Sequence, residues 1–457
     1  MVQDFNILDT RLTFFVVTNF LFAIISTYWL VRLIQVRRYV FIKPSIMLLA
    51  YTNIFLQWPA AIFSGYYEAW LPNPYTMMFL IHGFVLVGLA GSVSFLGPEA
   101  EQVWNRTRLE IGPNDIGMYY GCIILLTFLL GLVFVLYLSY VPITSTGLYA
   151  IIFDPLSSGM AREESLKLLE NSGLIYAFSI MTSSIAPLLM GLLTMVLIGK
   201  YAIHKAIKYT GSVFIIGLTA LAVSLTGARS GLFNIIVVVC FVILWKKGFS
   251  VHPLFLVLLA FLVLFPVIIM TLLREGKTIE DFAGLYFSYM GFILDRIFFM
   301  PFHVGCWYMH YAQENSPLGI GAIPKLAKLF RVEPLDGPNI IGLIYAPQYY
   351  GKAVIGSISA TSGYLFGLYG YFGIVSFPIS LLALWVTDIS VYMYKRLELF
   401  VLIPCLASMN LSTLMFVQSD YTVVILTHGF AMILLLSLAL SYLGRIGSLD
   451  SLWRRNA

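Results

Sequence analysis

Long apolar runs separated by short polar segments repeat along most of the chain. Many of these runs reach the ~20 residues that a helix needs to cross the hydrocarbon core of a bilayer. The predicted spans cover residues 12–34, 44–65, 75–97, 116–140, 174–198, 211–228, 230–246, 251–273, 365–390, 399–417 and 421–443. We therefore predict an all-α, polytopic membrane protein of about eleven helices, with residues 1–457 forming a single transmembrane bundle.

Composition supports this interpretation. Hydrophobic residues make up 60% of the chain and charged residues only 11%, whereas about a quarter of the residues in a soluble domain are charged. The four cysteines, Cys122, Cys240, Cys306 and Cys405, lie mostly inside predicted spans at no metal-like spacing, so neither a disulfide framework nor a zinc site is expected. The first apolar run follows acidic residues and is long enough to span, which argues against a cleavable signal peptide.

One long segment, residues 274–357, departs from this pattern because it gathers charged and aromatic residues. Its charged and imidazole side chains include Arg274, Glu275, Lys277, Glu280, Asp281, Asp295, Arg296, His303, His310, Lys325, Lys328, Arg331, Glu333, Asp336 and Lys352. Large aromatic residues such as Phe287, Trp307 and Tyr308 separate them, which is typical of a folded loop at a membrane surface. We expect any chemistry to take place here.

The distribution of lysine and arginine predicts the orientation. With the N-terminus outside, most basic residues fall at cytoplasmic ends of spans, and the 274–357 loop then lies on the outer face. Eight of the basic residues left outside are Arg229 or lie in this loop. Because this cluster opposes the positive-inside trend, it suggests an anionic ligand.

Two further outer features flank the loop. The chain turns sharply at residues 226–231, Thr-Gly-Ala-Arg-Ser-Gly, which places Arg229 at the outer membrane boundary either as an anchor or as a ligand-binding group. Residues 161–171 predict a short amphipathic helix that ends at Gly173.

Within the loop, residues 324–331 predict a basic interfacial helix that begins at Pro324. Helical spacing places Lys325, Lys328 and Arg331 on one arc, where they bind either anionic lipid headgroups or a phosphate-bearing substrate. We assign these three residues and Lys352 to substrate binding. In the spans, His82 and His428 are predicted to be hydrogen-bonded packing residues, and Asp388 is predicted to snorkel from the inner end of its span.

Several arginines at one water–membrane boundary suit a pyrophosphate, because guanidinium stays charged and offers two parallel donors to phosphate oxygens. A lipid-linked sugar pyrophosphate presents that group at that depth. Fixed cations can stabilise the negative charge that develops on the leaving pyrophosphate without a metal or cofactor. The acceptor hydroxyl needs a base, for which His303, Glu275, Asp295 and His310 are candidates. The sequence does not rank them, and our working hypothesis assigns the role to His303.

The arrangement resembles the Wzy-type O-antigen polymerases. The resemblance rests on the Gly-x-Arg turn, an arginine just after the span that opens a large outer loop, a second arginine about twenty residues later, and a glycine-rich return into the membrane near Gly367, Gly370 and Gly373. Arg229, Arg274 and Arg296 match the family's arginine positions. The family often has twelve or more spans, and a broken helix within residues 283–311 is a candidate for the missing element.

The resemblance implies an inverting, metal-independent glycosyltransferase of the GT-C-like membrane class. It would act on undecaprenyl-pyrophosphate-linked oligosaccharides at the periplasmic face of the bacterial inner membrane, with Arg229, Arg274 and Arg296 as catalytic residues. Our own assignment adds His303 to this catalytic set as the base. Membrane lipids and a chain-length regulator are the partners to consider, and no nucleic acid is expected. Two alternatives remain open: an O-antigen ligase with a lipid A core acceptor, and a non-enzymatic flippase or transporter of lipid-linked oligosaccharide.

Overall fold

The computed structural model describes residues 2–63, 74–110, 116–154, 157–171, 173–199, 205–227, 229–247, 300–315, 321, 327, 330–333, 335, 337–345, 373–418, 424–425 and 429–456. In these ranges the regular secondary structure is helical, and no strand occurs among them. This confirms the all-α class for the described part of the chain.

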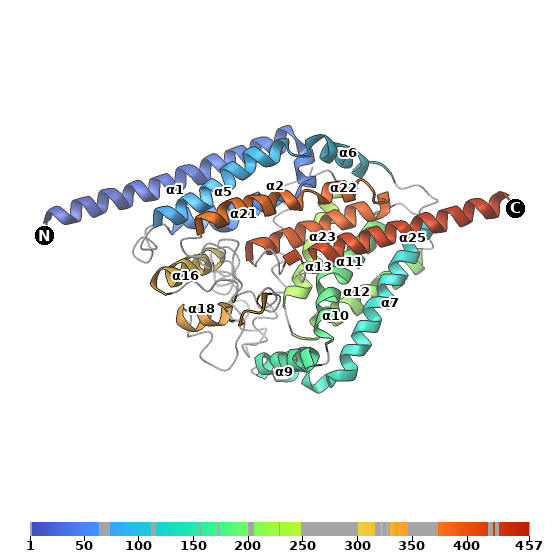
Figure 1. Cartoon of the computed structure of the whole chain (residues 1–457). Helices are drawn as coiled ribbons and strands as arrows, with labels where there is room; N and C mark the ends of the chain where they lie inside the picture. Colours follow the sequence, from blue (N-terminus) through green and yellow to red (C-terminus); the bar gives the residue numbers. More distant parts are fainter. Residues whose placement is uncertain are drawn as a thin grey trace. The chain divides into compact units, whose positions relative to one another are not determined.

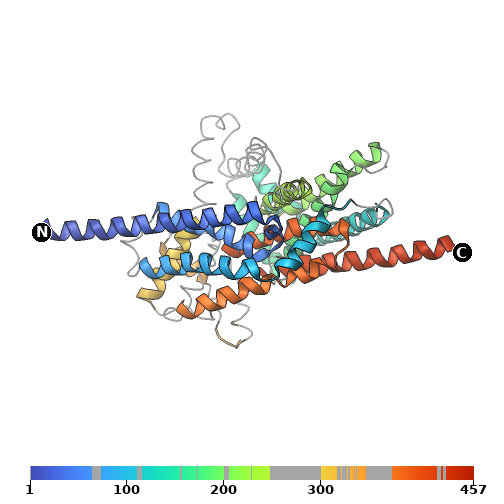
Figure 2. The ribbon, with the colours of Figure 1, turned by 90° about the horizontal axis from the view of Figure 1, so that it is seen from above.

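The chain divides into two compact units. The first comprises Met1–Glu101, Gly291–Val391 and Thr413–Tyr421. Its elements are α1 (Val2–Val36), η1 (Arg38–Ile42), α2 (Pro44–Thr52), η2 (Asn53–Gln57), α3 (Trp58–Ile62), α5 (Pro74–Ser94), α16 (Met300–Glu314), α18 (Gly337–Tyr345) and α21 (Gly373–Thr387). Within this unit α5 packs against α1, α2 and α21, and the two views show these helices side by side (Figures 1 and 2).

The second unit comprises Gln102–Met290, Tyr392–Ser412 and Thr422–Ala457. It contains α7 (Ile116–Tyr140), η4 (Ile143–Ser145), α8 (Gly147–Phe153), α9 (Ser158–Asn171), α10 (Ile175–Ile180), η6 (Met181–Ile185), α11 (Ala186–Ile198), α12 (Lys205–Ser224), α13 (Arg229–Lys246) and α25 (Phe430–Asn456). Three helices, α6 (Gly97–Thr107), α22 (Ser390–Tyr394) and α23 (Leu399–Gln418), contain the points where the chain passes between units. In the second unit α11 is central, because it packs against α7, α12 and α13.

Five described helices are long and apolar enough to cross a membrane, or six if one bent pair counts as a single span. The five are Phe14–Val36, Pro44–Ile62, Gly117–Tyr140, Ile175–Ile198 and Leu399–Val417, and the bent pair is Ile81–Ser94 with Gly97–Thr107. The five helices match five of the predicted spans closely, whereas the bent pair coincides with the predicted span 75–97 only in its first helix. Four shorter apolar helices, Lys208–Ser224, Ser230–Lys246, Ser380–Tyr394 and Phe430–Ile446, lie where four further spans were predicted. These apolar helices indicate a multi-pass membrane protein. The number of eleven spans stays a prediction.

Several predicted features lie outside the described residues or are described only in part. The predicted span 251–273 lies outside the described residues, as do Gly367, Gly370 and His428. The predicted broken helix within 283–311 is described only from residue 300 onwards, where α16 begins. The short helix predicted over residues 161–171 is confirmed: α9 covers Ser158–Asn171, and Gly173 follows with a φ of 72°.

A π-helical turn interrupts two of the long spans, and each interruption has the same local cause. The first, Asn53–Gln57, comes directly before Trp58-Pro59, and the second, Met181–Ile185, comes directly before Ala186-Pro187. A proline ring inside an α-helix clashes with the carbonyl four residues earlier and cannot donate to it. The wider π-turn, in which Trp58 N donates to Asn53 O and Ala186 N to Met181 O, makes room for the proline.

Basic residues at the predicted cytoplasmic ends of spans bind the backbone there. Arg106 donates to the carbonyl oxygens of Lys395 at 2.7 Å and Leu397 at 2.6 Å, and Lys208 Nζ donates to Gly199 O at 3.0 Å. Carbonyl groups at a helix C-terminus lack intrahelical partners and favour a positive charge. These side chains therefore stabilise helix ends in the second unit.

Candidate functional site

Only part of the predicted site lies within the described residues. Arg274, Arg296, Lys325, Lys328 and Lys352 fall outside them. Arg229 is the first residue of α13, although only its backbone is described, and His303 lies on α16. Arg229 belongs to the second unit and His303 to the first.

The turn that carries Arg229 is held by close backbone contact. Gly227 has a φ of 70°, a left-handed conformation that favours glycine, and its amide donates to Ser224 O at 2.7 Å. On the other side, Leu148 N at the start of α8 donates to Leu225 O at 3.1 Å. Gly147 lies so close that a β-carbon there would overlap the carbonyl oxygen of Thr226. The residues from Leu225 to Gly227, which precede α13, are therefore held by their neighbours.

Arg331 ends the basic helix predicted over residues 324–331. Ala327 and Phe330 are helical, and Arg331 takes a left-handed φ of 56°. Val332 N then donates to Ala327 O at 2.9 Å, which is the long hydrogen bond of a Schellman helix end. The arginine is exposed and occupies a position where glycine is usual.

His303 lies in an aromatic environment near the start of α16. Its ring meets Phe63 edge-on with 5.4 Å between ring centroids and lies 6.4 Å from Phe302. The side chain is half-buried. The ring contacts of His303 are thus with Phe63, the residue after α3, and with Phe302, a setting less polar than the predicted role as base suggests.

A second histidine on the same helix, His310, contacts a hydroxyl and a carboxylate. His310 Nδ1 lies 2.9 Å from the Tyr345 hydroxyl oxygen on α18, and His310 Nε2 lies 3.4 Å from Glu314 Oε1. Helices α16 and α18 pack together (Figure 1). The hydroxyl, the imidazole and the carboxylate therefore form a connected series. His310 was one of four open candidates for the base, whereas neither Tyr345 nor Glu314 was singled out in the sequence.

Trp307 completes this group, which we call the α16–α18 cluster: Trp307, His310, Glu314 and Tyr345. The rings of Trp307 and Tyr345 are stacked, 6.0 Å apart with only 7° between their planes. Burial, Glu314 and Tyr311 raise the pKa of Tyr345 to about 12, so its hydroxyl keeps its proton at neutral pH. The i, i+4 spacing of His310 and Glu314 was a usable sequence signal; nothing in the sequence places Tyr345 beside them.

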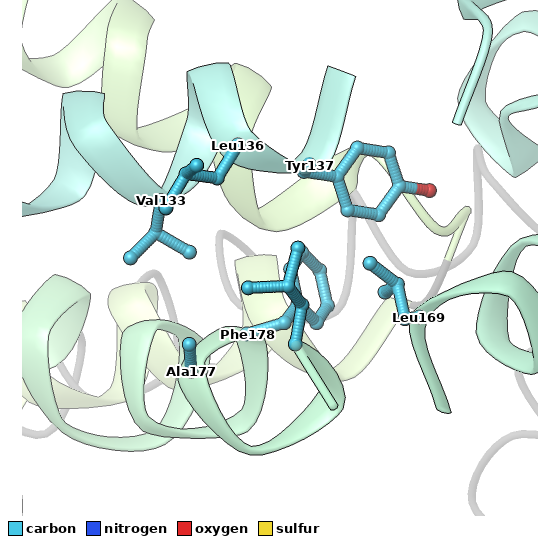
Figure 3. A pocket seen from close by; sticks show the side chains of 7 residues that line it. Val133, Leu136, Tyr137, Leu169, Ala177 and Phe178 are labelled. Atoms are coloured by element: carbon cyan, nitrogen blue, oxygen red, sulfur yellow. The ribbon is translucent and has the colours of Figure 1, made fainter. Parts of the chain in front are cut away.

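The described second unit also contains an apolar hollow between α7, α9 and α10 (Figure 3). Val133, Leu136, Tyr137, Leu169, Ala177 and Phe178 line it. These side chains offer hydrocarbon and aromatic surface and no charged group. The hollow therefore does not suit a pyrophosphate.

Buried polar groups of the first unit form a chain between helices. Gln57 Nε2 lies 2.8 Å from His82 Nδ1, and His82 Nε2 lies 2.8 Å from Asn19 Oδ1. Asn53 joins the chain by donating to Gln57 Oε1 at 2.7 Å. The packing role predicted for His82 is confirmed, because both ring nitrogens have polar partners within α1, η2 and α5.

The prediction that Asp388 snorkels to water is wrong. Its side chain is fully buried and forms an ion pair with the equally buried Lys43, at 3.1 Å from Nζ to Oδ2. Ser45 also donates to this carboxylate, from its amide at 2.9 Å and from its hydroxyl at 2.6 Å. The physical reason is that a cation and two further donors at the start of α2 replace the water that snorkelling would have supplied.

Comparisons of the chain with protein-family models, with curated protein sequences and with solved structures find no significant match. The argument for function therefore rests on the residues themselves.

Proposed function

We propose that this chain is an O-antigen-type polysaccharide polymerase. It transfers undecaprenyl-pyrophosphate-linked glycan onto the non-reducing end of a lipid-linked repeat unit at the periplasmic face of the bacterial inner membrane. The reaction inverts the anomeric carbon and needs no metal. The observation that carries the proposal is the α16–α18 cluster, which sets a stacked aromatic pair beside a hydroxyl, an imidazole and a carboxylate.

This cluster suits a saccharide acceptor for two reasons. A sugar ring has an apolar face that packs on aromatic rings, and Trp307 and Tyr345 present such rings. A sugar hydroxyl must also lose a proton as it attacks, and an imidazole is the commonest group to assist that loss. Both features occur in the outer loop predicted from the sequence, within a chain whose other described helices are largely apolar.

The donor's pyrophosphate is assigned to the arginines. Arg229, Arg274 and Arg296 provide permanently charged planar groups that can each hold two phosphate oxygens. Lys325, Lys328, Arg331 and Lys352 add positive charge to the same loop, which attracts an anionic substrate and the anionic lipids around it. The isoprenoid chain of the donor remains in the bilayer beside the apolar helices.

The direct test is an extension assay with purified protein in detergent or liposomes. A lipid-linked repeat unit serves as donor and acceptor, and the expected product is a ladder of longer lipid-linked glycans. The ladder should also form in EDTA, because fixed arginines stabilise the leaving group. Transfer to lipid A core without a ladder would instead identify a ligase. Absence of both products would refute a glycosyltransferase.

His303 is tested in the same assay. If it is the base, His303→Ala lowers turnover about 10²- to 10⁴-fold while the protein stays monodisperse. If His303→Ala keeps the wild-type rate and pH profile, the base must be His310, Glu275 or Asp295 instead.

Orientation is tested by cysteine labelling. All four native cysteines are buried and free, so a single introduced cysteine gives a clear signal. Lys325→Cys and Lys352→Cys should react with an impermeant maleimide from the periplasmic side. Labelling only after the inner membrane is permeabilised would overturn the periplasmic assignment.

A second candidate function, a flippase of lipid-linked oligosaccharide, is favoured by one observation. The first unit buries charged and polar groups among apolar helices, including Lys43, Asp388, Gln57 and His82, and such groups commonly line transport pathways. A flippase moves labelled lipid-linked oligosaccharide across liposomes without lengthening it. Translocation in the absence of any extension would favour this function over the polymerase.

A further inference from the structure

We propose that Tyr345, His310 and Glu314 form a proton relay that activates the saccharide acceptor hydroxyl, with the stacked rings of Trp307 and Tyr345 as the platform for the acceptor sugar. This inference rests on the proposed polymerase function and names the acceptor side of its site. It differs from the working hypothesis, which placed the base at His303.

The positions of the protons follow from the contacts. Glu314 as a carboxylate can only accept a hydrogen bond, so His310 Nε2, 3.4 Å away, carries the imidazole proton. In the neutral ring Nδ1 is then an acceptor, and the Tyr345 hydroxyl 2.9 Å from it must be the donor. The phenol oxygen keeps lone pairs that can accept a proton from a sugar hydroxyl. Tyr345 therefore stands at the substrate end of the series and Glu314 at the other.

The transfer balances in one concerted step. The acceptor hydroxyl gives its proton to the Tyr345 oxygen while the Tyr345 proton moves to His310 Nδ1, so no phenolate accumulates. The acceptor oxygen bonds to the anomeric carbon of the donor, and the bond from that carbon to the pyrophosphate oxygen breaks with its electron pair on the pyrophosphate. His310 becomes an imidazolium that faces the Glu314 carboxylate, and it later releases its proton to water.

The burial of these side chains fits their order. His310 is mostly buried, with 20% of its side chain exposed, whereas Glu314 is 58% exposed. The inner members are thus shielded, and the carboxylate at the far end reaches solvent, where the proton can leave. The raised pKa of Tyr345 agrees with this order, because the residue then donates as a phenol and does not ionise near neutral pH.

The aromatic platform and the relay can be separated experimentally. Tyr345→Phe removes the hydroxyl but keeps the ring that stacks on Trp307. We expect it to lower kcat about 10²- to 10⁴-fold and to leave the KM for the acceptor nearly unchanged. Trp307→Leu removes the stacked ring and keeps the relay, so it should raise the acceptor KM with a smaller effect on kcat.

Substitution of Glu314 tests the far end of the relay. Glu314 on α16 and Tyr345 on α18 are titratable groups that lie against the His310 ring. Glu314→Gln removes the negative charge that faces the imidazolium formed in the step, so it should lower kcat. Glu333→Gln makes the same carboxylate-to-amide change at an exposed residue outside the α16–α18 cluster, so it is the matched control and should behave as wild type.

The measurement is the initial rate of extension by the full-length protein with saturating lipid-linked donor, for wild type and each variant. A monodisperse Tyr345→Phe variant with wild-type kcat and pH profile would refute the relay and leave the polymerase intact. A wild-type protein that extends no lipid-linked repeat would refute the proposed function and this inference together.

Discussion

Lys43 and Asp388 form an ion pair in which both side chains have no exposed surface. Lys43 precedes α2 and also donates to the carbonyl oxygens of Ser92 and Phe95 near the end of α5, while Asp388 follows α21. One pair of side chains thus joins three helices of the first unit. Burial lowers the pKa of Lys43, and Asp388 opposes that shift by favouring the ammonium form.

Breaking this pair on one side should destabilise the protein strongly. Lys43→Met leaves the Asp388 carboxylate buried without its cation, which typically costs about 3–5 kcal/mol in the free energy of unfolding. The double variant Lys43→Met with Asp388→Leu leaves no buried charge and should recover most of that loss. Reversible unfolding in a detergent titration measures both.

Lys395→Met is the matched control, because Lys395 is exposed and should change the unfolding free energy by less than about 0.5 kcal/mol. A double variant no more stable than Lys43→Met alone would show that the pair is not the source of the effect.

Gly147 provides a test of how the Arg229 turn is held. Alanine at this position would place its methyl group on the Thr226 carbonyl oxygen, so α8 or the turn must move. We expect Gly147→Ala to cost about 1–3 kcal/mol of unfolding free energy and to reduce extension because Arg229 shifts with the turn. Gly131→Ala, on α7 where a β-carbon meets nothing within 4 Å, should lose neither stability nor activity.

The sequence predicted the helices that depend on local composition. The runs that became Pro44–Ile62, Gly117–Tyr140 and Leu399–Val417 were located within a few residues, because an apolar run of spanning length has few other stable outcomes in a bilayer. Proline spacing could also have indicated the two π-turns, since each precedes an X-Pro pair.

Contacts between distant residues could not be predicted in this way. Nothing near Asp388 in the sequence indicates Lys43, so the carboxylate was expected to reach water. In the same way His310 could be chosen from its helix neighbour Glu314, but Tyr345 enters only when α18 packs on α16. Charge pairing and acid–base function depend on tertiary packing, which hydrophobic periodicity does not encode.

Replacing Arg331 by glycine should raise the stability of the protein and weaken its binding of the donor. A non-glycine residue in the left-handed region costs about 1–2 kcal/mol, and Arg331 has a φ of 56°. Arg331→Gly should therefore unfold at a higher detergent concentration. If the guanidinium attracts the anionic donor, the same variant has a higher KM for the lipid-linked donor. Arg331→Lys keeps both the strain and the charge, so it is the control and should resemble wild type. An unchanged donor KM in Arg331→Gly would show that Arg331 does not bind the substrate.

Arg229→Lys most directly separates a catalytic arginine from a membrane anchor. Arg229 is the first residue of α13 and comes two residues after Gly227, whose positive φ and close approach to Gly147 mark the turn. An anchor needs only a long stem and a positive charge, and lysine supplies both. A pyrophosphate clamp needs a planar group that holds two oxygens together as the leaving group gains charge, which an ammonium group cannot do.

Loss of one such preorganised donor typically costs ~3 kcal/mol in the transition state, or about 10²-fold in rate. We therefore expect Arg229→Lys to insert normally, to remain monodisperse in detergent and to lose most of its extension activity, with Arg274→Lys and Arg296→Lys behaving alike. Lys246→Arg, at the other end of α13, is the control for a basic residue that only terminates a helix and should keep wild-type activity. If Arg229→Lys makes polymer of normal length at the wild-type rate, Arg229 is an anchor, and the remaining arginines of the loop must bind the pyrophosphate without it.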